Sequence, residues 1–181
     1  MQHLGGWCTL KILVLSDSHS GRSFMRYCIQ NVRPEHVIHL GDHYEDAEVM
    51  AQEYSHIRFH MVPGNCDRYR MVRQVADIMC YPIGGVKFLM THGHKHGVKS
   101  DICRVIADAR ARGAQAVLFG HTHSALCFQA EEDGLWVMNP GACGSWGGSV
   151  GLFEVSDGKI IACRILRQAD IEVMQVPVKT E

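Results

Sequence analysis

The chain has 181 residues, which suits one domain and is long enough to bury a substantial core. Hydrophobic residues make up 46% and charged residues 20%, so the composition excludes an intrinsically disordered chain. The formal net charge of −1 gives no general attraction for nucleic acid or for an anionic membrane surface. No apolar run approaches the roughly 18 residues that a membrane span needs, so we expect no membrane segment.

The eight cysteines of the chain are scattered and include no CxxC pair. The first residues, MQHLGGWCTLKILVL, lack the charged start that is typical of a secretion signal. Scattered thiols without such a signal are typical of a reducing compartment. We therefore expect a cytoplasmic protein whose cysteines are all reduced.

Apolar runs alternate with helical patterns over the first part of the chain. We expect strands over 9–16, 37–40, 57–62, 78–83, 86–91 and 116–119. Helical patterns cover 20–31, 45–54 and 100–112, and in the last of these Ser100 can cap the start and Gly113 can end the helix. The pair Gly84-Gly85 predicts a hairpin between the two strands that flank it.

After residue 124 the pattern changes to short strands joined by turns. We expect strands over 125–130, 135–138, 150–155 and 159–166. Alternating β/α units followed by an antiparallel run predict a layered α/β protein with mixed sheets. The sequence shows no internal repeat and no linker, so we expect a single domain over residues 1–181.

Five of the predicted strands run directly into short loops that carry Asp, Asn or His. These loops are Asp17-Ser18-His19, Gly41-Asp42, Gly64-Asn65-Cys66-Asp67, His92-Gly93-His94 and Gly120-His121-Thr122-His123. Because α/β sheets bind ligands at the carboxyl ends of their strands, we expect the five loops to meet at one sheet edge. A lone Asp or His at a strand end more often bonds to backbone, so only the joint pattern indicates a site.

Seven side chains of these loops offer nitrogen or oxygen donors to metal ions: Asp17, His19, Asp42, Asn65, His92, His121 and His123. If one carboxylate serves both ions, seven donors make two sites of four ligands each. Donors of this kind, without thiolate, favour manganese, iron, zinc, nickel or cobalt over calcium. Two such ions about 3.5–4 Å apart form a clamp for in-line phosphoryl transfer, and their excess positive charge suits a phosphate ester.

The five loops, in this order and spacing, resemble the calcineurin-like metallophosphoesterase family. Together with Asn139-Pro140-Gly141, they are most similar to its small YfcE-type phosphodiesterase branch, over roughly residues 10–166. The resemblance implies a four-layer αββα sandwich, in which two mixed β-sheets are flanked by helices. It also implies a dinuclear metal-dependent phosphoesterase, in which a hydroxide shared by both ions attacks a small phosphate ester. Members of the family commonly work with manganese and cleave phosphodiesters or monoesters, and we expect a phosphodiesterase here.

The resemblance further implies which residues hold each ion. Asp17, His19 and His123 would hold the first, Asn65, His92 and His121 the second, and Asp42 would bridge both. In the wider superfamily a histidine follows the asparagine and serves as acid to the leaving group, whereas this chain has Cys66. The small branch shares that cysteine, so the family assignment stands while the acid is left unidentified.

Two further residues are candidates for a role in the site. His94, two residues beyond His92, is our candidate for the leaving-group acid or a phosphate contact, with a surface histidine as the alternative. Asp67 is expected to fix a loop or to orient a ligand histidine.

Trp146 is expected to pack against other side chains or, less often, to stack on a nucleobase. The basic run of Arg68, Arg70 and Arg73 is expected to be a solvated helix face.

The same fold has a second use, that of a catalytically silent Vps29-like scaffold that binds proteins. Such scaffolds are degraded at the ligand positions, whereas all seven ligands are present here, so we favour the enzyme. A nuclease of long nucleic acid would need a strongly basic balance, which this chain lacks. We therefore expect a small phosphate ester as the partner, and the sequence is compatible with a homo-oligomer.

Overall fold

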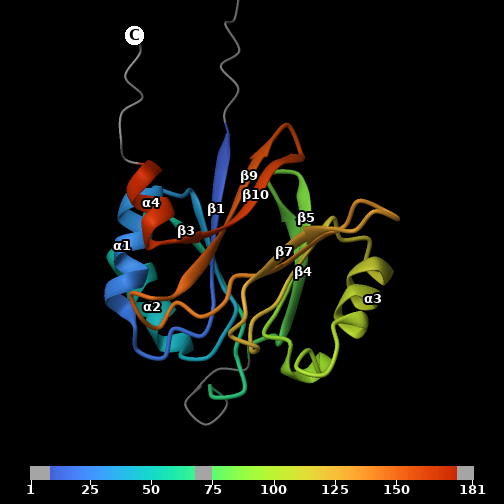
Figure 1. Cartoon of the computed structure of the whole chain (residues 1–181), viewed down its shortest axis with the longest axis horizontal. Helices are drawn as coiled ribbons and strands as arrows, with labels where there is room; N and C mark the ends of the chain where they lie inside the picture. Colours follow the sequence, from blue (N-terminus) through green and yellow to red (C-terminus); the bar gives the residue numbers. More distant parts are fainter. Residues whose placement is uncertain (1–8, 68–74, 175–181) are drawn as a thin grey trace, which may run out of the picture.

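Two five-stranded β-sheets pack face to face at the centre of the molecule, with helices on both outer faces (Figure 1). The computed structural model describes residues 9–67 and 75–174. Sheet A has the strand order β10-β9-β1-β2-β3, and sheet B has the order β4-β5-β6-β8-β7. The expected four-layer αββα sandwich of two mixed sheets is therefore confirmed.

Sheet A is assembled from both ends of the chain. Strand β1 (Leu10–Leu15) runs parallel to β2 (His36–His39), which runs parallel to β3 (Arg58–Met61). On the other side of β1 lies β9 (Ser149–Ser156), antiparallel to it, and β10 (Lys159–Arg167) is antiparallel to β9. The first strand of the chain is therefore the central strand of its sheet, and a polar loop follows it there.

Sheet B is formed by the middle of the chain. Strands β4 (Ile78–Ile83) and β5 (Val86–Thr91) form the predicted hairpin, with positive φ at both glycines of its turn. Strand β5 runs parallel to β6 (Ala116–Leu118), and β6 runs parallel to β8 (Trp136–Asn139). Strand β7 (Leu126–Gln129) is antiparallel to β8 and forms the edge of the sheet.

The helices cover the outer faces of both sheets. Helices α1 (Arg22–Val32), α2 (Tyr44–Glu53) and α4 (Gln168–Met174) lie on sheet A, and α3 (Cys103–Ala111) lies on sheet B (Figure 1). A 3-10 helix, η1 (His94–His96), follows β5. None of the helices in the described ranges has the length and apolarity that a membrane span requires.

Three apolar layers hold the sandwich together, and β1 contributes to two of them. Leu13 and Leu15 pack under the helices of sheet A, whereas Ile12 and Val14 pack between the two sheets. This division follows from the alternation of side chains along a strand. All four side chains are fully buried, which explains the uninterrupted apolar run of this strand.

Some helix ends differ from the prediction. The helix expected over 100–112 begins only at Cys103, so the cap proposed for Ser100 is wrong. The carboxylate of Asp101 accepts the N–H of Cys103 at 2.6 Å instead. At its other end Gly113 takes a φ of 64°, as a terminating glycine does. The seven-residue helix α4 was missed, because its short pattern buries only Ile171.

Candidate metal centre

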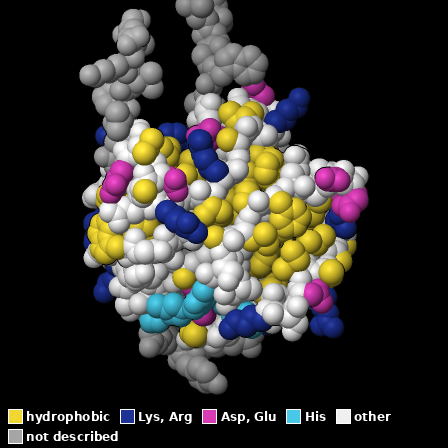
Figure 2. All heavy atoms as spheres, viewed as in Figure 1, with side chains coloured by type: hydrophobic (Ala, Val, Ile, Leu, Met, Phe, Trp, Pro, Cys, Tyr) yellow, Lys and Arg dark blue, Asp and Glu magenta, His cyan; other side chains and the backbone are white. Residues whose placement is uncertain are grey.

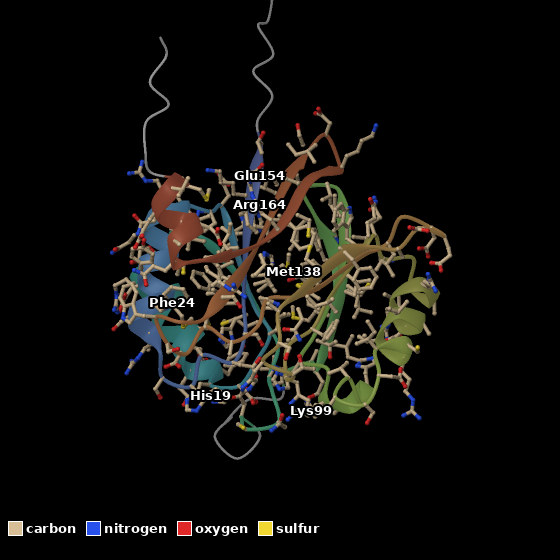
Figure 3. The ribbon with its side chains drawn as sticks, in the orientation of Figure 1. His19, Phe24, Lys99, Met138, Glu154 and Arg164 are labelled. Atoms are coloured by element: carbon tan, nitrogen blue, oxygen red, sulfur yellow. The ribbon has the colours of Figure 1, made fainter. Side chains whose placement is uncertain are left out.

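The five polar loops meet at one end of the sandwich, where both sheets present carboxyl ends of strands. Figure 3 labels His19 and Lys99 at this end, and Figure 2 shows histidine side chains gathered there. Three loops follow strands β1, β2 and β3 of sheet A, and two follow β5 and β6 of sheet B. We expected the five loops at the edge of one sheet, and this expectation is wrong. The strands that precede the loops belong to two packed sheets, and the carboxyl ends of these strands lie at the same end of the sandwich.

The first donor cluster contains Asp17, His19 and His123. Their ligand atoms all lie within 4.8 Å of one another. Nε2 of His123 is 3.1 Å from Oδ1 of Asp17 and 3.4 Å from Nε2 of His19. Asp17 is fully buried, and both histidines are exposed. The cluster therefore opens to solvent on its histidine side.

The carboxylate of Asp17 leaves one oxygen available to a cation. Its Oδ2 accepts hydrogen bonds from Oγ of Ser16 at 2.6 Å and from the N–H of His121 at 3.0 Å. Its buried Oδ1 has no hydrogen-bond partner among the described residues, since the nearby His123 nitrogen is not oriented to donate to it. A buried carboxylate oxygen without a donor is costly, and a bound cation removes that cost. The donor set therefore fits a divalent ion.

The second donor cluster contains Asp42, His92 and His121, whose ligand atoms also lie within 4.8 Å of one another. His92 is fully buried, and its Nδ1 lies 2.8 Å from the carbonyl oxygen of Leu40. That carbonyl places a proton on Nδ1 and orients the ring so that Nε2 faces the other donors of the cluster. Nε2 lies 3.1 Å from Oδ1 of Asn65 and 3.5 Å from Oδ1 of Asp42. One nitrogen and two oxygen donors thus converge within the reach of a single ion.

The charge states of this cluster also suit a cation. Burial acts to raise the pKa of Asp42, but the N–H of Cys66, 3.0 Å from Oδ1, and the nearby His92 outweigh it and lower the pKa overall. Burial lowers the pKa of His121, and His92 and Lys99 lower it further. Asp42 is therefore held as an anion and His121 as a neutral ring, which are the forms that ligate metals.

Asp67 joins the loop after β3 to the loop after β2, and its side chain is 1% exposed. Its Oδ2 accepts the N–H groups of Gly64 at 2.7 Å and Asp42 at 3.0 Å. Its Oδ1 accepts those of His43 at 2.8 Å and Tyr44 at 2.9 Å, at the start of α2. We predicted that Asp67 either fixes a loop or orients a ligand histidine. These hydrogen bonds to backbone N–H groups support the first of the two roles.

Asp46, in the first turn of α2, is a site residue that the sequence analysis missed. Its buried carboxylate accepts Oγ of Ser18 at 2.9 Å and the N–H of Ser20 at 2.8 Å, and it lies 3.5 Å from Nε of Arg22. These contacts hold the loop that presents Asp17 and His19. Acidic residues are common in the first turn of a helix, because they interact favourably with the helix dipole. The sequence therefore does not indicate that the side chain of Asp46 also contacts another loop.

Left-handed backbone is concentrated at this end of the molecule. Five of the seven candidate ligands have φ between 42° and 69°: Asp17, His19, Asp42, His121 and His123. Such conformations at non-glycine residues cost of order 1 kcal/mol each and persist only where the surroundings enforce them. The same strain at His19 and Ser20 delays the start of α1 from the expected residue 20 to Arg22.

Trp146 lies in the loop before β9 and is 50% exposed. Its ring is 5.7 Å from the ring of Phe24 and 5.1 Å from that of Tyr27, between centroids. We expected Trp146 either to pack against other side chains or to stack on a nucleobase. Its contacts with Phe24 and Tyr27 support the packing role. The basic run of Arg68, Arg70 and Arg73 lies outside the described residues.

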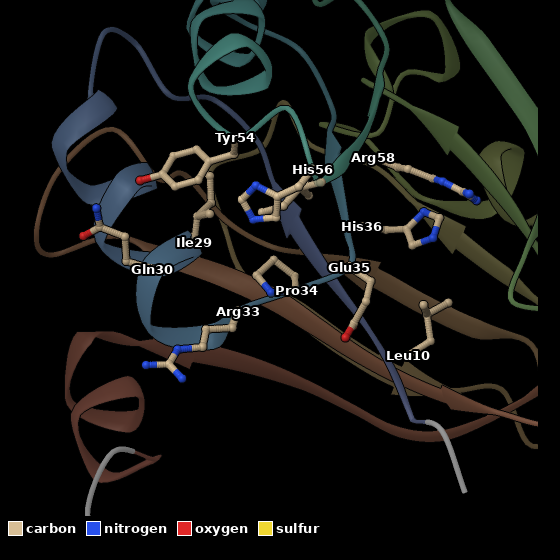
Figure 4. Close-up of a pocket in the computed structure, with 11 residues that line it drawn as sticks. Leu10, Ile29, Gln30, Arg33, Pro34, Glu35, His36, Tyr54, His56 and Arg58 are labelled. Atoms are coloured by element: carbon tan, nitrogen blue, oxygen red, sulfur yellow. The ribbon is translucent and has the colours of Figure 1, made fainter. Parts of the chain in front are cut away.

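A separate hollow of about 690 Å³ lies at the opposite end of sheet A, where β1, β2 and β3 begin (Figure 4). Its lining includes Arg33, His36, His56 and Arg58, beside apolar residues such as Ile29. None of the seven candidate ligands lines it. This hollow is therefore separate from the candidate metal centre at the carboxyl ends of the strands.

His39, behind the metal centre, makes the stability of the fold depend on pH. It is fully buried, with Nε2 3.3 Å from Oγ of Ser18, and burial lowers its pKa from 6.5 to about 4. Between pH 6.5 and 4 the unfolded chain binds a proton that the folded chain excludes. The free energy of unfolding should therefore fall as the pH falls, by at most about 1.4 kcal/mol per pH unit for this group.

Urea unfolding of chelator-treated protein at several pH values between 4 and 7 measures this dependence. His39→Asn should lower the free energy of unfolding at pH 7 and should also give a shallower dependence on pH below 6.5. His56→Asn, at an exposed position, is the matched control and should follow the native protein. His60, whose pKa burial also lowers to about 4, leaves a residual slope in both variants. Parallel curves for His39→Asn and the native protein would contradict the assignment.

Comparison with known proteins agrees with this geometry. The family model of the calcineurin-like phosphoesterase superfamily domain matches residues 10–158, which include all five loops. A probable metallophosphoesterase of Bacillus subtilis is 31% identical over 133 residues, which are 74% of this chain and 75% of that protein. A phosphodiesterase of Methanocaldococcus jannaschii is 28% identical, over 74% of this chain and 84% of its own. The chain belongs to the calcineurin-like phosphoesterase superfamily, as its loops predicted.

Solved structures share the fold. A predicted phosphoesterase of Streptococcus pneumoniae superposes with a TM-score of 0.70 at 19% identity, covering 91% of this chain and 92% of that one. Vacuolar protein sorting 29 of Cryptosporidium parvum has a TM-score of 0.67 at 17% identity, over 90% and 100% of the two chains. The phosphoesterase YfcE of Escherichia coli has a TM-score of 0.57 at 17% identity, over 86% and 98%. Enzymes and Vps29 proteins thus share this architecture.

Proposed function

We propose that the chain is a dinuclear metal-dependent phosphoesterase that acts on phosphodiesters. The observation that carries the proposal is the pair of donor clusters, with the buried Oδ1 of Asp17 lacking a donor among the described residues. Asp17, His19 and His123 would hold one ion, and Asn65, His92 and His121 the other. Asp42 would serve both, and the electrostatic influence of both His92 and His19 on its pKa supports that position.

Each donor is held by the chain in the form that a metal needs. The bond between Nδ1 of His92 and Leu40 turns its other nitrogen toward the cluster, and Ser16 and the His121 amide keep the Asp17 carboxylate oriented. When bound, two divalent ions would lower the pKa of a water for attack on phosphorus and offset the charge that develops. The nitrogen and oxygen donors suit manganese, nickel, zinc, iron or cobalt, and the family resemblance favours manganese among them.

The alternative function is a scaffold of the Vps29 kind. The shared fold does not separate the two, since a Vps29 structure and a phosphoesterase structure match this chain about equally well. The seven donors favour the enzyme, because a protein-binding surface has no need of histidine and carboxylate side chains that converge in two clusters. The name of the M. jannaschii relative further supports a phosphodiester as substrate.

The test is an activity screen of metal-stripped protein reloaded with manganese, nickel, zinc, iron or cobalt. Panels of small phosphodiesters and phosphomonoesters serve as substrates, and elemental analysis counts the bound ions. We expect two ions per chain and turnover of diesters, greatest with manganese. Folded protein that binds two ions and turns over no ester with any of them would instead indicate the scaffold.

His94 is our candidate for the acid that protonates the leaving group. Its ring lies 5.4 Å from that of His92 and 6.1 Å from that of His121, beside the second cluster. A nitrophenolate departs without a proton, whereas an alkoxide requires one, and general acid catalysis is worth about 10²–10⁴ in rate. His94→Ala should therefore slow diesters with alkyl leaving groups by about 10²-fold or more and slow nitrophenyl diesters far less, with unchanged metal content.

The matched control is His96→Ala in the same 3-10 helix. His96 contacts Asp108 of α3 at 3.2 Å, so this variant should slow neither class of substrate. Equal slowing of both classes by His94→Ala would instead identify a phosphate or metal contact. Unchanged rates for both classes would exclude both roles for His94.

A further inference from the structure

Two cysteines meet across the two sheets, away from the metal centre. Cys127 lies on β7, an edge strand of sheet B, and Cys163 lies on β10, an edge strand of sheet A. Their Sγ atoms are 2.9 Å apart. Both side chains are half-buried and pack against the apolar layer between the sheets. Figure 1 shows β7 and β10 side by side where the two sheets approach at this edge.

A bulge in β10 directs Cys163 toward sheet B. Ile160 pairs with Val155, but the next partners are Ala162 with Glu154, so Ile161 is an extra residue in the strand. Side chains alternate along a strand, and Ile160 points into the layer between the sheets. In a regular strand, residue 162 would point into this layer like Ile160, and Cys163 would point outward. With the bulge, Ile161 is 57% exposed and Cys163 faces Cys127.

We propose that Cys127 and Cys163 form a site of reversible disulfide formation that joins sheet A to sheet B. A disulfide bond is about 2.05 Å long, so the sulfurs need to approach by less than about 1 Å. Both cysteines sit on paired strands, Cys127 opposite Met138 and Cys163 opposite Phe153, so the sheets hold each backbone in a defined position. The bond would link the sheet that carries Asp17 and Asp42 to the sheet that carries His92.

The two thiols are not equivalent in reactivity. The hydrogen bond that they share lowers the pKa of Cys127 and raises that of Cys163, because the Cys163 proton stabilises a thiolate on Cys127. In contrast, burial raises the pKa of Cys28 to about 12 and also raises that of Cys143. Since the thiolate is the nucleophile, Cys127 is the one expected to react first.

The oxidant is a low-molecular-weight disulfide of the glutathione type. The Cys127 thiolate attacks one of its sulfurs, its S–S bond breaks, and one thiolate leaves while a mixed disulfide forms on Cys127. Cys163 then gives its proton to the departed thiolate and attacks Sγ of Cys127, which expels the second thiolate; this takes up a proton from water. The proton taken from water replaces the one that Cys127 released to water when it ionised. Counted from the two thiols, the cysteines lose two electrons and two protons, and the small disulfide is reduced to two thiols.

The experiment treats the reduced full-length chain with glutathione buffers of increasing oxidised fraction. Thiols are counted after denaturation, and peptide mapping without reduction locates any link. We expect a peptide joined through Cys127 and Cys163. The two cysteines lie 36 positions apart in the chain, so the bond should raise the Tm by roughly 5–10 °C, reversibly with reductant.

Three single variants complete the design. Cys163→Ser should trap a glutathione adduct on Cys127, and neither Cys163→Ser nor Cys127→Ser should give the Cys127–Cys163 peptide. Cys80→Ser, at a half-buried position on the other edge strand of sheet B, is the matched control and should still form the link. The native chain alone decides the proposal if a variant fails to fold. A map without the Cys127–Cys163 peptide at any buffer ratio, or a Tm that oxidation leaves unchanged, would overturn it.

Discussion

Asp42→Asn is expected to reduce turnover by at least about 10³-fold and to lower the occupancy of both metal sites. The change removes the negative charge of the residue proposed to serve both ions and keeps its shape. Charge stabilisation by metal ions is worth several kcal/mol in the transition state, and about 4 kcal/mol corresponds to 10³-fold in rate. Elemental analysis and the rate of diester hydrolysis measure the two effects.

Two comparisons make this result specific. Asp157→Asn, in the exposed turn between β9 and β10, makes the same chemical change far from the loops and should leave metal content and rate unaltered. His123→Ala should mainly empty the first site, since His123 belongs to the first donor cluster alone. Two tightly bound ions per chain in Asp42→Asn would rule out the bridging role.

Gly64→Ala is expected to disable the centre through the position of Asp42. A β-carbon at residue 64 would lie 2.1 Å from Oδ1 of Asp42 and 2.4 Å from its backbone nitrogen, so the ligand has to move. Overpacking of this kind typically costs 1–3 kcal/mol of stability. A shift of about 1 Å in a catalytic group costs about 10²-fold in rate. We expect losses of this size in urea unfolding and in diester hydrolysis.

Gly147→Ala is the matched control for this variant. A β-carbon at Gly147 meets nothing within 4 Å, so stability and rate should both stay at native values. A Gly64→Ala protein with native stability but a 10²-fold slower rate would still support the positioning of Asp42. Native rates in Gly64→Ala would show that the position of Asp42 does not limit catalysis.

The strands and the polar loops could be predicted because their signals are local. β1 is an apolar run that ends at Asp17, and each later loop is likewise marked by a glycine or a change from apolar to polar residues. The seven candidate ligands were identified in the same way, and the structure brings them together. Their assignment to particular ions rests on the family resemblance and stays a prediction.

The division of the strands between two sheets could not be predicted from such signals. β3 and β4 are neighbours in the chain but lie in different sheets, and nothing in their composition reports that. The left-handed backbone at His121 and His123 was also invisible, because tertiary contacts enforce it against local preference. The same holds for Asp46, whose contacts with Ser18 and Ser20 span 26 residues or more.

The construction of sheet A from both ends of the chain affects how the protein is made. All seven proposed ligands lie between residues 17 and 123, but β9, which pairs with β1, begins only at Ser149. The amide of Cys143 also bonds to the carbonyl of Ser16, beside Asp17. A chain growing from its N-terminus on the ribosome therefore exposes every metal-binding side chain before the strand and loop that fix Asp17 exist. A prematurely terminated chain of about 140 residues would keep all seven donors and would lack the support that assembles them.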